Sequence, residues 1–220
     1  AAVATFYTQS EPATTDADGR YVITQADPAR NSHTLFARQP GFVEARVEVD
    51  GKNPLPAYDL VLRRGVRVHG RVFNPKGTPV DAAELYVGFS PHAYNRLDAK
   101  TRDDGTFEFP AVESGKQTMV TSKNGLAPDT RVLEIPKDRT EFAVDVHLQI
   151  AHFLAGVVVD GSGKGLAGVS ISVRVQKPDG AEHRDRRGDY LDVRTATGAD
   201  GAFRLDGLPA GVVNLEAYGT

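Results

Sequence analysis

Two Asp-rich segments are the first candidates for chemistry, because closely spaced carboxylates can bind calcium. The segments Asp16–Gly19 and Asp103–Gly105 are similar to the start of a calcium-binding loop. Such a loop needs further oxygen ligands and a Glu at its twelfth position, and the twelfth residue from Asp16 is Asp27. A third segment of the same type keeps only Asp200. We therefore expect each Asp to cap a turn in which the neighbouring Gly supplies a positive φ.

Histidine is the next residue type that could hold a metal. None of the histidines forms an HxH pair or an HExxH motif with another, so no metal site is expected from their spacing; they are His33, His69, His92, His147, His152 and His183. The chain has no Cys, which excludes disulfides, thiolate metal sites and Cys nucleophiles. No cofactor is expected either.

The segment Gly161–Gly165 resembles a phosphate-binding loop but departs from its pattern. Val158 stands where the loop needs its first Gly, and Gly165 stands where it needs Ser or Thr. No Gly-x-Ser-x-Gly motif occurs, and no Ser, His and Asp arrangement stands out. We expect a turn between two strands here, and no catalytic residues in the chain.

The polar stretch Lys177–Tyr190 is the candidate interaction loop. It contains the tripeptide Arg187–Asp189, which matches an integrin-adhesion motif but is short enough to occur by chance. A long exposed loop on a rigid scaffold is nevertheless a usual place for binding. The candidate residues are Arg184, Arg186, Arg187, Asp189 and Tyr190.

Exposed aromatic side chains could stack on sugar rings. The candidates for such stacking are Tyr86, Phe89, Tyr94 and Tyr190. The position of Tyr86 within its strand predicts a core residue, and Phe107, Phe109 and Phe203 are also predicted in the core. The absence of Trp makes sugar binding the weaker alternative.

Composition narrows the class of protein. The 220 residues carry a formal net charge of −3 and are 40% hydrophobic, which is ordinary for a folded soluble chain. The balanced charge gives no footprint for nucleic acid. The longest apolar stretch, residues 153–159, is far too short to span a bilayer, so we expect no membrane insertion by this segment.

A repeat organises the elements that position these residues. The pattern Thr-x-x-Asp-Gly-x-Phe/Tyr begins at Thr15, Thr101 and Thr197, with steps of 86 and 96 residues. Residues 70–72 and 156–158 keep the offset of 86, as do residues 77–85 and 163–171. The second step is longer because ten extra residues lie within Lys177–Tyr190.

Within each repeat the pattern predicts strands and turns. Residues 43–49, 66–72 and 142–148 alternate apolar with polar, which is typical of strands with one buried face. Asp-Gly before an alternating segment predicts a hairpin turn. No segment carries a helical apolar period between caps, so no helix is predicted.

The order of these motifs resembles the carboxypeptidase regulatory domain-like family, whose prealbumin-like relatives include the collagen-adhesin B-type repeats. The resemblance rests on Gly70–Val72, on the Gly-x-Pro-Val-x-x-Ala segment at Gly77–Ala83 and on Thr101–Phe107. Intradiol dioxygenases share this sandwich and a similar turn, but they bind iron through two Tyr and two His with an HxH pair, which this chain lacks. The resemblance implies an all-β fold of tandem prealbumin-like (Ig-like) β-sandwiches with short linkers.

We expect three repeats. The first, residues 1–65, lacks its first strand; the middle repeat, residues 66–151, is complete; and the third, residues 152–220, lacks its last strands. We use these names below. The chain is then a fragment of a longer polypeptide.

The resemblance and the failed catalytic motifs favour a non-catalytic structural or interaction module of a bacterial extracytoplasmic or surface protein, in the periplasm, on the cell surface or secreted. Its partners would be a protein or a polysaccharide. Two alternatives stay open: carbohydrate-binding accessory domains of a secreted enzyme, and the noncatalytic tail of a metallopeptidase. An adhesin-like isopeptide crosslink would need a Lys near a buried acid, for which Lys100, Lys116 and Lys123 are the candidates.

Overall fold

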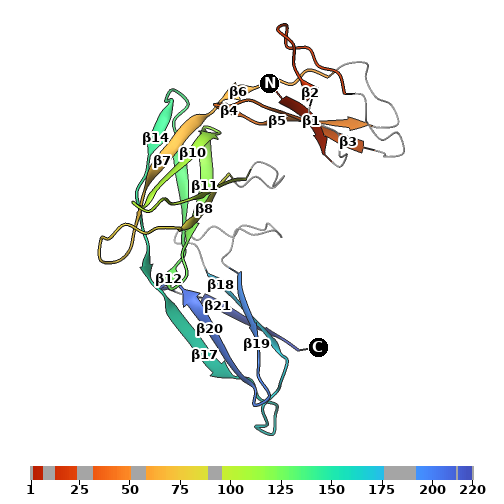
Figure 1. Cartoon of the computed structure of the whole chain (residues 1–220). Helices are drawn as coiled ribbons and strands as arrows, with labels where there is room; N and C mark the ends of the chain where they lie inside the picture. The colour runs from red at the N-terminus through yellow and green to blue at the C-terminus, as the bar shows by residue number, and fades with distance from the viewer. Residues whose placement is uncertain are drawn as a thin grey trace. The chain divides into compact units, whose positions relative to one another are not determined.

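The computed structural model describes residues 2–6, 13–23, 32–50, 58–88, 96–175, 192–211 and 213–219. All regular elements in these ranges are β-strands, and no helix occurs among them. The all-β prediction is therefore confirmed, and the strands form the paired sheets of β-sandwiches (Figure 1). Backbone contacts divide the chain into two compact units, residues 1–69 with 108–117 and 134–143, and residues 70–107 with 118–133 and 144–220. The three repeat boundaries stay a prediction.

The first repeat holds one antiparallel sheet in the order β2-β1-β3-β5. Its strands are β1 (Ala2–Phe6), β2 (Ala13–Thr14), β3 (Ser32–Arg38) and β5 (Ala45–Asp50). A small sheet pairs β4 (Phe42–Val43) with β6 (Arg63–Arg64). The strand predicted at residues 43–49 is thus divided at Glu44, whose carboxylate bonds Arg38 and Arg46.

In the middle repeat one sheet has the order β10-β7-β14, and β15 also pairs with β7. These strands are β7 (Val66–Phe73), β10 (Thr106–Val112), β14 (Glu141–Ala143) and β15 (Val146–His147). The strand predicted at residues 142–148 is interrupted at Val144 and Asp145. There the Asp145 carboxylate accepts the Arg71 backbone N–H at 2.9 Å in place of a ladder bond.

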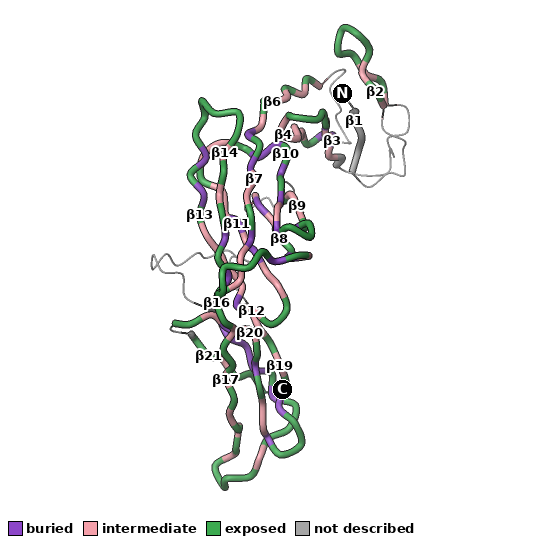
Figure 2. Tube along the Cα trace, turned by 60° about the vertical axis from the view of Figure 1, so that its left-hand side comes forward, coloured by how far each residue is buried: buried purple, intermediate pink, exposed green. Residues whose placement is uncertain are grey.

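The other sheet of the middle repeat has the order β13-β11-β8-β9. Its strands are β8 (Glu84–Val87), β9 (Leu97–Lys100), β11 (Gly115–Ser122) and β13 (Asp129–Ile135), while β12 (Leu126–Ala127) pairs with β16 (Gln149–Ile150). Buried residues alternate with exposed ones along β7 and β10, as on the inner face of a sandwich (Figure 2). Phe107 and Phe109 are 2% and 0% exposed, which confirms their predicted place in the core.

The third repeat has a two-stranded sheet of β17 (His152–Val157) and β20 (Ala202–Leu208). Its second sheet has the order β19-β18-β21, with β18 (Ser170–Val175), β19 (Asp192–Ala196) and β21 (Val213–Tyr218). A core cluster joins β18 with β20 through Val169, Ile171, Val173, Leu205 and Leu208. Phe203 packs against this cluster but is only partly buried, so its predicted core position is correct in part.

Candidate functional site

The repeated Thr joins two segments of its repeat through hydrogen bonds. The Thr101 hydroxyl accepts the Ala83 N–H and donates to the Val80 carbonyl, both at 2.7 Å. The Thr197 hydroxyl accepts the Val169 N–H at 2.9 Å and donates to the Leu166 carbonyl at 2.6 Å. Both side chains are buried. Each of these buried hydroxyls both donates and accepts a hydrogen bond within the fold. The two Thr residues therefore have a structural role.

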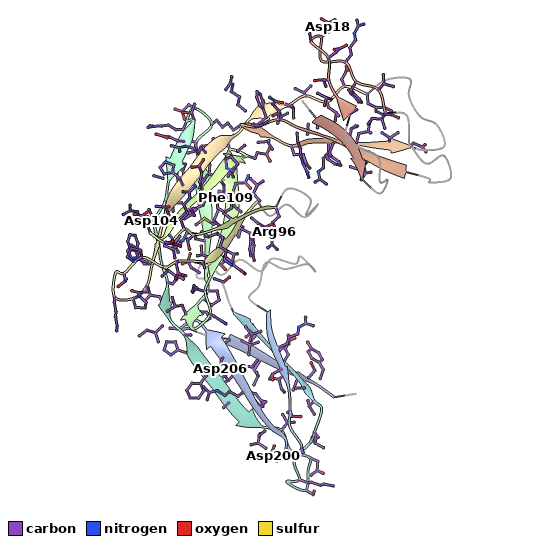
Figure 3. All side chains as sticks on the ribbon, in the orientation of Figure 1. Asp18, Arg96, Asp104, Phe109, Asp200 and Asp206 are labelled. Atoms are coloured by element: carbon purple, nitrogen blue, oxygen red, sulfur yellow. The ribbon has the colours of Figure 1, made fainter. Side chains whose placement is uncertain are left out.

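The repeated Asp caps its own turn. Asp104 accepts the backbone N–H and the hydroxyl of Thr106 at 3.0 and 2.6 Å, and Asp200 accepts the Ala202 N–H at 3.0 Å (Figure 3). In the first repeat the turn is held by Asp16, two residues before the repeated Asp18, and its carboxylate accepts the N–H groups of Asp18 and Arg20. The bonds from Thr106 lower the pKa of Asp104, because they stabilise its charged form. These contacts agree with the capping prediction.

The loop that resembles a phosphate site is held by Asp160. Its carboxylate accepts the Ser162 N–H at 2.8 Å, the Ser162 hydroxyl at 2.6 Å and the Lys164 N–H at 3.0 Å. These bonds, the Ser162 hydroxyl first, lower the pKa of Asp160. The amide groups that a phosphate would need are therefore already bonded to a carboxylate. The equivalent Asn74 binds Lys76 N–H and Thr78 N–H in the same way.

No group of three or more His, Asp or Glu side chains that could hold a metal occurs among the residues that the structure describes. Charged and titratable side chains do gather on β7 and on its neighbours β10 and β14. Arg67 bonds Glu141 at 2.8 Å and lies 3.5 Å from Glu108, while His69 lies 3.8 Å from Glu141. The bond to Arg67 lowers the pKa of Glu141. All four groups have substantial solvent exposure, which makes this a surface ion-pair cluster.

The predicted interaction loop lies outside the described residues. This applies to Arg184, Arg186, Arg187, Asp189 and Tyr190, and also to Phe89 and Tyr94. Of the sugar-stacking candidates, Tyr86 is placed, and the prediction that it faces the core is wrong. Leu85 and Val87 take the inner positions of β8, so Tyr86 lies on the other face with the Arg96 guanidinium 4.3 Å from its ring centre.

The Lys candidates for a crosslink lie at the surface. Lys123 donates to the Asp81 carbonyl at 2.6 Å and lies 3.5 Å from its carboxylate, which is well exposed. Lys116 pairs with Glu134 at 3.4 Å, where both side chains are at least 75% exposed. Lys100 is also exposed. An isopeptide bond depends on a buried acid, and within the described part of the chain the acids paired with Lys116 and Lys123 are exposed.

The apolar outer face of β17 and the residues just after it was not predicted from the sequence. Phe153, Val157 and Val159 are 59%, 61% and 50% exposed, and exposed residues line the strand in Figure 2. The Arg204 guanidinium lies 3.9 Å from the Phe153 ring centre and pairs with Asp206. A comparison of repeats could have found this face, because the middle repeat places Arg67 and Arg71 where β17 has Phe153 and Val157.

No helix in the described ranges has the length and apolar character needed to cross a membrane.

Comparisons with known proteins give distant likenesses in structure. No protein-family profile matches the chain, and no curated protein matches it. Chlorocatechol 1,2-dioxygenase from Pseudomonas putida is similar over 38% of this chain and 59% of its own, with 12% identity and a TM-score of 0.32. A streptococcal ancillary pilin is similar over 84% and 66%, with 15% identity and a TM-score of 0.34.

The Bacillus anthracis TIE protein is similar over all of this chain and 42% of its own, with 16% identity and a TM-score of 0.30. This chain thus spans about three fifths of the dioxygenase and two fifths of the TIE protein. These likenesses include a dioxygenase and a pilin, and no function follows from them.

Proposed function

We propose that this chain is a non-catalytic, load-bearing spacer built from carboxypeptidase regulatory-like β-sandwich repeats, within a bacterial extracytoplasmic or surface protein. The observation that carries the proposal is the parallel pairing of the opening and closing strands of the middle repeat. Glu141–Ala143 pair in parallel with Arg67–His69, and Val146 and His147 pair with Val72 and Phe73.

Parallel pairing decides how the repeat responds to tension along the chain. Force would pull the start of β7 and the end of β15 in opposite directions along the same axis. The hydrogen bonds between the two strands would then be loaded together in shear, whereas antiparallel terminal strands would open one bond at a time. Because forced unfolding is governed by the unfolding rate, simultaneous loading favours resistance to force.

The hydrogen bonds of the repeated polar residues support the non-catalytic part of the proposal. Several polar residues of the repeated turns have types and spacing that could suit a reactive site: Thr101, Thr197, Asp104, Asp200 and Asp160. Each has its functional oxygen in hydrogen bonds to neighbouring backbone groups. Their repetition is accounted for by the turns that they hold.

Single-molecule pulling on the full chain, tethered at its two ends, tests the proposal. We expect one resistant event that releases the chain between residues 66 and 148, an extended length of about 27–30 nm. The variant Arg71→Pro removes the N–H that binds Asp145 and should lower the force of that event. A smooth extension with no resistant event would contradict the proposal.

A second assay tests the absence of dioxygenase chemistry. Ferric ion and catechol are added to the chain, and absorbance is followed for a tyrosinate–iron band and for ring cleavage. We expect neither, because the chain lacks an HxH pair. Ring cleavage that depends on iron would contradict the proposal.

A further inference from the structure

The turn between β11 and β12 carries the chain's single Asn-Gly pair, Asn124–Gly125. The Leu126 N–H donates to the Lys123 carbonyl at 3.0 Å, which places the pair at the two central positions of the turn. Gly125 has a φ of 82°, whereas the φ of Asn124 is negative, as in a type II turn. Both central residues are exposed to solvent.

The reactive groups of this pair are not held by hydrogen bonds. Neither the Gly125 N–H nor the Asn124 side chain has a hydrogen-bond partner among the residues that the structure describes. A Cβ built at Gly125 would meet no atom within 4 Å, so the space around this residue is open. Nothing in the described part of the chain thus holds the Gly125 nitrogen away from the side-chain carbonyl carbon of Asn124.

The repeated Asp-Gly turns differ, because their groups are already bonded. The Gly105 N–H donates to the Arg102 carbonyl at 2.8 Å, and the Asp104 carboxylate accepts the N–H and the hydroxyl of Thr106. In the third repeat the Gly201 N–H is bonded in the same way, at 2.9 Å. A charged carboxylate is in addition a poor electrophile. These turns are therefore much less reactive than Asn124–Gly125.

The other Asn residues that the structure describes lack these requirements. Asn74 is followed by Pro75, which has no N–H, and its side-chain oxygen accepts two backbone N–H groups. Asn214 lies within β21, whose backbone pairs with β18, and the side chain of Leu215 hinders access to the next nitrogen. The chemistry of an exposed Asn before a free Gly nitrogen is thus confined to Asn124 among them.

We propose that Asn124 is a site of spontaneous deamidation through a cyclic imide formed with Gly125. The Gly125 nitrogen attacks Cγ of Asn124, the bond from Cγ to Nδ2 breaks, and Nδ2 leaves as ammonia with the proton of the Gly125 N–H. Water then opens the imide at one of its two carbonyl carbons. Opening at Cγ gives an Asp side chain, and opening at the backbone carbonyl gives isoaspartate, in which the peptide bond runs through Cγ. The proposal is independent of the resistance to force.

The products would change the turn that leads into β12. Either product places a carboxylate there, which is ionised at neutral pH, and isoaspartate also adds a methylene group to the main chain. The longer main chain no longer matches the bond from the Leu126 N–H to the Lys123 carbonyl. Because β12 pairs with β16 through Leu126 and Ala127, the modification should loosen this pairing.

The first repeat contains the same turn without the reactive side chain. The Phe42 N–H donates to the Gln39 carbonyl at 3.0 Å, and Gly41 has a φ of 80°. Pro40 stands there in the position of Asn124, and a two-residue strand follows each turn, β4 in the one and β12 in the other. Pro is favoured at this position of a type II turn. The variant Asn124→Pro therefore keeps a turn that this chain already uses and removes the electrophile.

The test keeps the full chain in mildly alkaline buffer for several weeks and follows it by mass spectrometry. An Arg-specific protease releases residues 103–131, in which Asn124 is the one Asn. We expect a gain of about 1 Da at Asn124, with both Asp and isoaspartate among the products. The gain at Asn74 and Asn214 should be at least about tenfold slower, because no unhindered nitrogen follows them.

Two outcomes of this incubation would overturn the proposal. The first is an unmodified Asn124 in the folded chain while the urea-unfolded chain reacts, which would show that the turn protects the pair. The second is a gain at Asn74 or Asn214 as fast as the gain at Asn124.

Two variants test the cyclic route. Asn124→Pro should show no gain at this position and should keep the circular dichroism of the parent. Asn124→Gln keeps a side-chain amide but must close a larger ring, so its loss of ammonia should be at least about tenfold slower. An equal rate for Asn124→Gln and the parent would contradict attack by the Gly125 nitrogen.

Hydrogen exchange gives a readout that does not depend on mass. The Leu126 amide should exchange faster in the aged parent than in the fresh parent, because the turn bond to Lys123 is lost. Aged Asn124→Pro should match its own fresh sample. Unchanged exchange at Leu126 in a fully modified chain would overturn the predicted loosening of β12.

Discussion

Two buried Thr side chains in the middle repeat have opposite hydrogen-bonding states. Thr101 is 6% exposed and its hydroxyl has both a donor and an acceptor partner. Thr121 is 0% exposed, and its hydroxyl has no hydrogen-bond partner among the residues that the structure describes. An unpaired buried hydroxyl costs free energy, whereas a paired one stabilises the fold. The same residue type therefore has opposite effects at two positions.

Thr101→Val should lower the free energy of unfolding by about 2–3 kcal/mol, because the Ala83 N–H and the Val80 carbonyl lose their partner. Thr121→Val, the matched control, should raise it by about 1 kcal/mol, because it removes an unpaired polar group of similar size. Urea unfolding followed by circular dichroism measures both. Equal effects of the two substitutions would be inconsistent with this account.

Asp160 contributes a pH-dependent part of stability. Its pKa is lowered in the folded chain, first by the Ser162 hydroxyl and then by the backbone N–H groups of Lys164 and Ser162. The stabilisation is thus present above the unfolded pKa of about 3.9 and is lost as the pH falls through the lower folded value.

The substitution Asp160→Asn should remove this titration and keep the turn, because Asn74 makes the equivalent bonds with a neutral side chain. The variant should lose less stability than the parent between about pH 4 and pH 2. Unfolding by urea across this range measures the difference. An identical acid dependence in parent and variant would show that the Asp160 turn does not contribute.

At the scale of the element, the two β-turns that precede β8 and β18 adopt the same backbone with different residues. Ala82 has a φ of 46° and Gly168, its equivalent, has a φ of 73°. The Ala82 N–H binds Thr101 and the Gly168 N–H binds Thr197. The left-handed conformation is strained for Ala and is free of that strain for Gly.

Ala82→Gly should therefore stabilise the chain, by about 0.5–1 kcal/mol after the larger unfolded-state entropy of Gly is included. Gly168→Ala should destabilise it by about 1 kcal/mol. Thermal unfolding of both variants measures the pair. A destabilising Ala82→Gly would contradict the strain at Ala82.

Gly70 and Gly156 occupy equivalent positions in β7 and β17. A Cβ at Gly70 would lie 1.8 Å from the carbonyl oxygen of Val144, which lies between β14 and β15. A Cβ at Gly156 would meet only the Phe203 ring, at 2.9 Å. Backbone cannot move aside as a ring can, so the Val144 backbone makes the requirement for Gly strict in β7.

Gly70→Ala should cost at least about 3 kcal/mol, at the upper end of the range for overpacking, and Gly156→Ala about 1 kcal/mol. Chemical unfolding of the two variants compares them. Equal costs would mean that the backbone at Val144 moves away from β7 to make room for the added methyl group.

At the scale of the whole molecule, the repeats differ in how completely their cores are covered. The middle repeat holds fully buried Phe109 and Met119, whereas Leu154, Val158 and Phe203 of the third repeat are only partly buried. Apolar burial is the main favourable contribution to folding. The third repeat should therefore open more readily than the middle one.

Native-state hydrogen exchange should show this difference directly. We expect the amides of β17 and β20 to exchange at least tenfold faster than the hydrogen-bonded amides of β7 and β10, through partial opening of the third repeat. Exchange measured by NMR as a function of low denaturant resolves the two openings. A single opening energy for both repeats would show that they unfold as one cooperative unit.

Much of the fold could be predicted because its signals are local. The turn at Thr101–Phe107 needs an Asp to accept amides and a Gly with positive φ, and both requirements are visible in the residue types. The strand at residues 66–72 shows its buried face in its alternation. Because the motifs repeat, each of these local predictions applies to the equivalent position of another repeat as well.

Predictions failed where a distant contact decides the outcome. Tyr86 faces away from the core because the register of β8 against β11 places Leu85 and Val87 inside. The strand expected at residues 142–148 is interrupted because Asp145 bonds Arg71 on β7, 74 residues away in sequence. Neither contact can be recognised from the residues next to Tyr86 or Asp145 in the sequence.

The sequence by itself determined the all-β class, the repeated turns and the residues that cap them, because side-chain period and turn chemistry are properties of neighbouring residues. Only the tertiary structure decided that β14 and β15 run parallel to β7. The reason is that strand pairing joins residues far apart in the chain, and alternation within a strand does not specify which strand lies beside it.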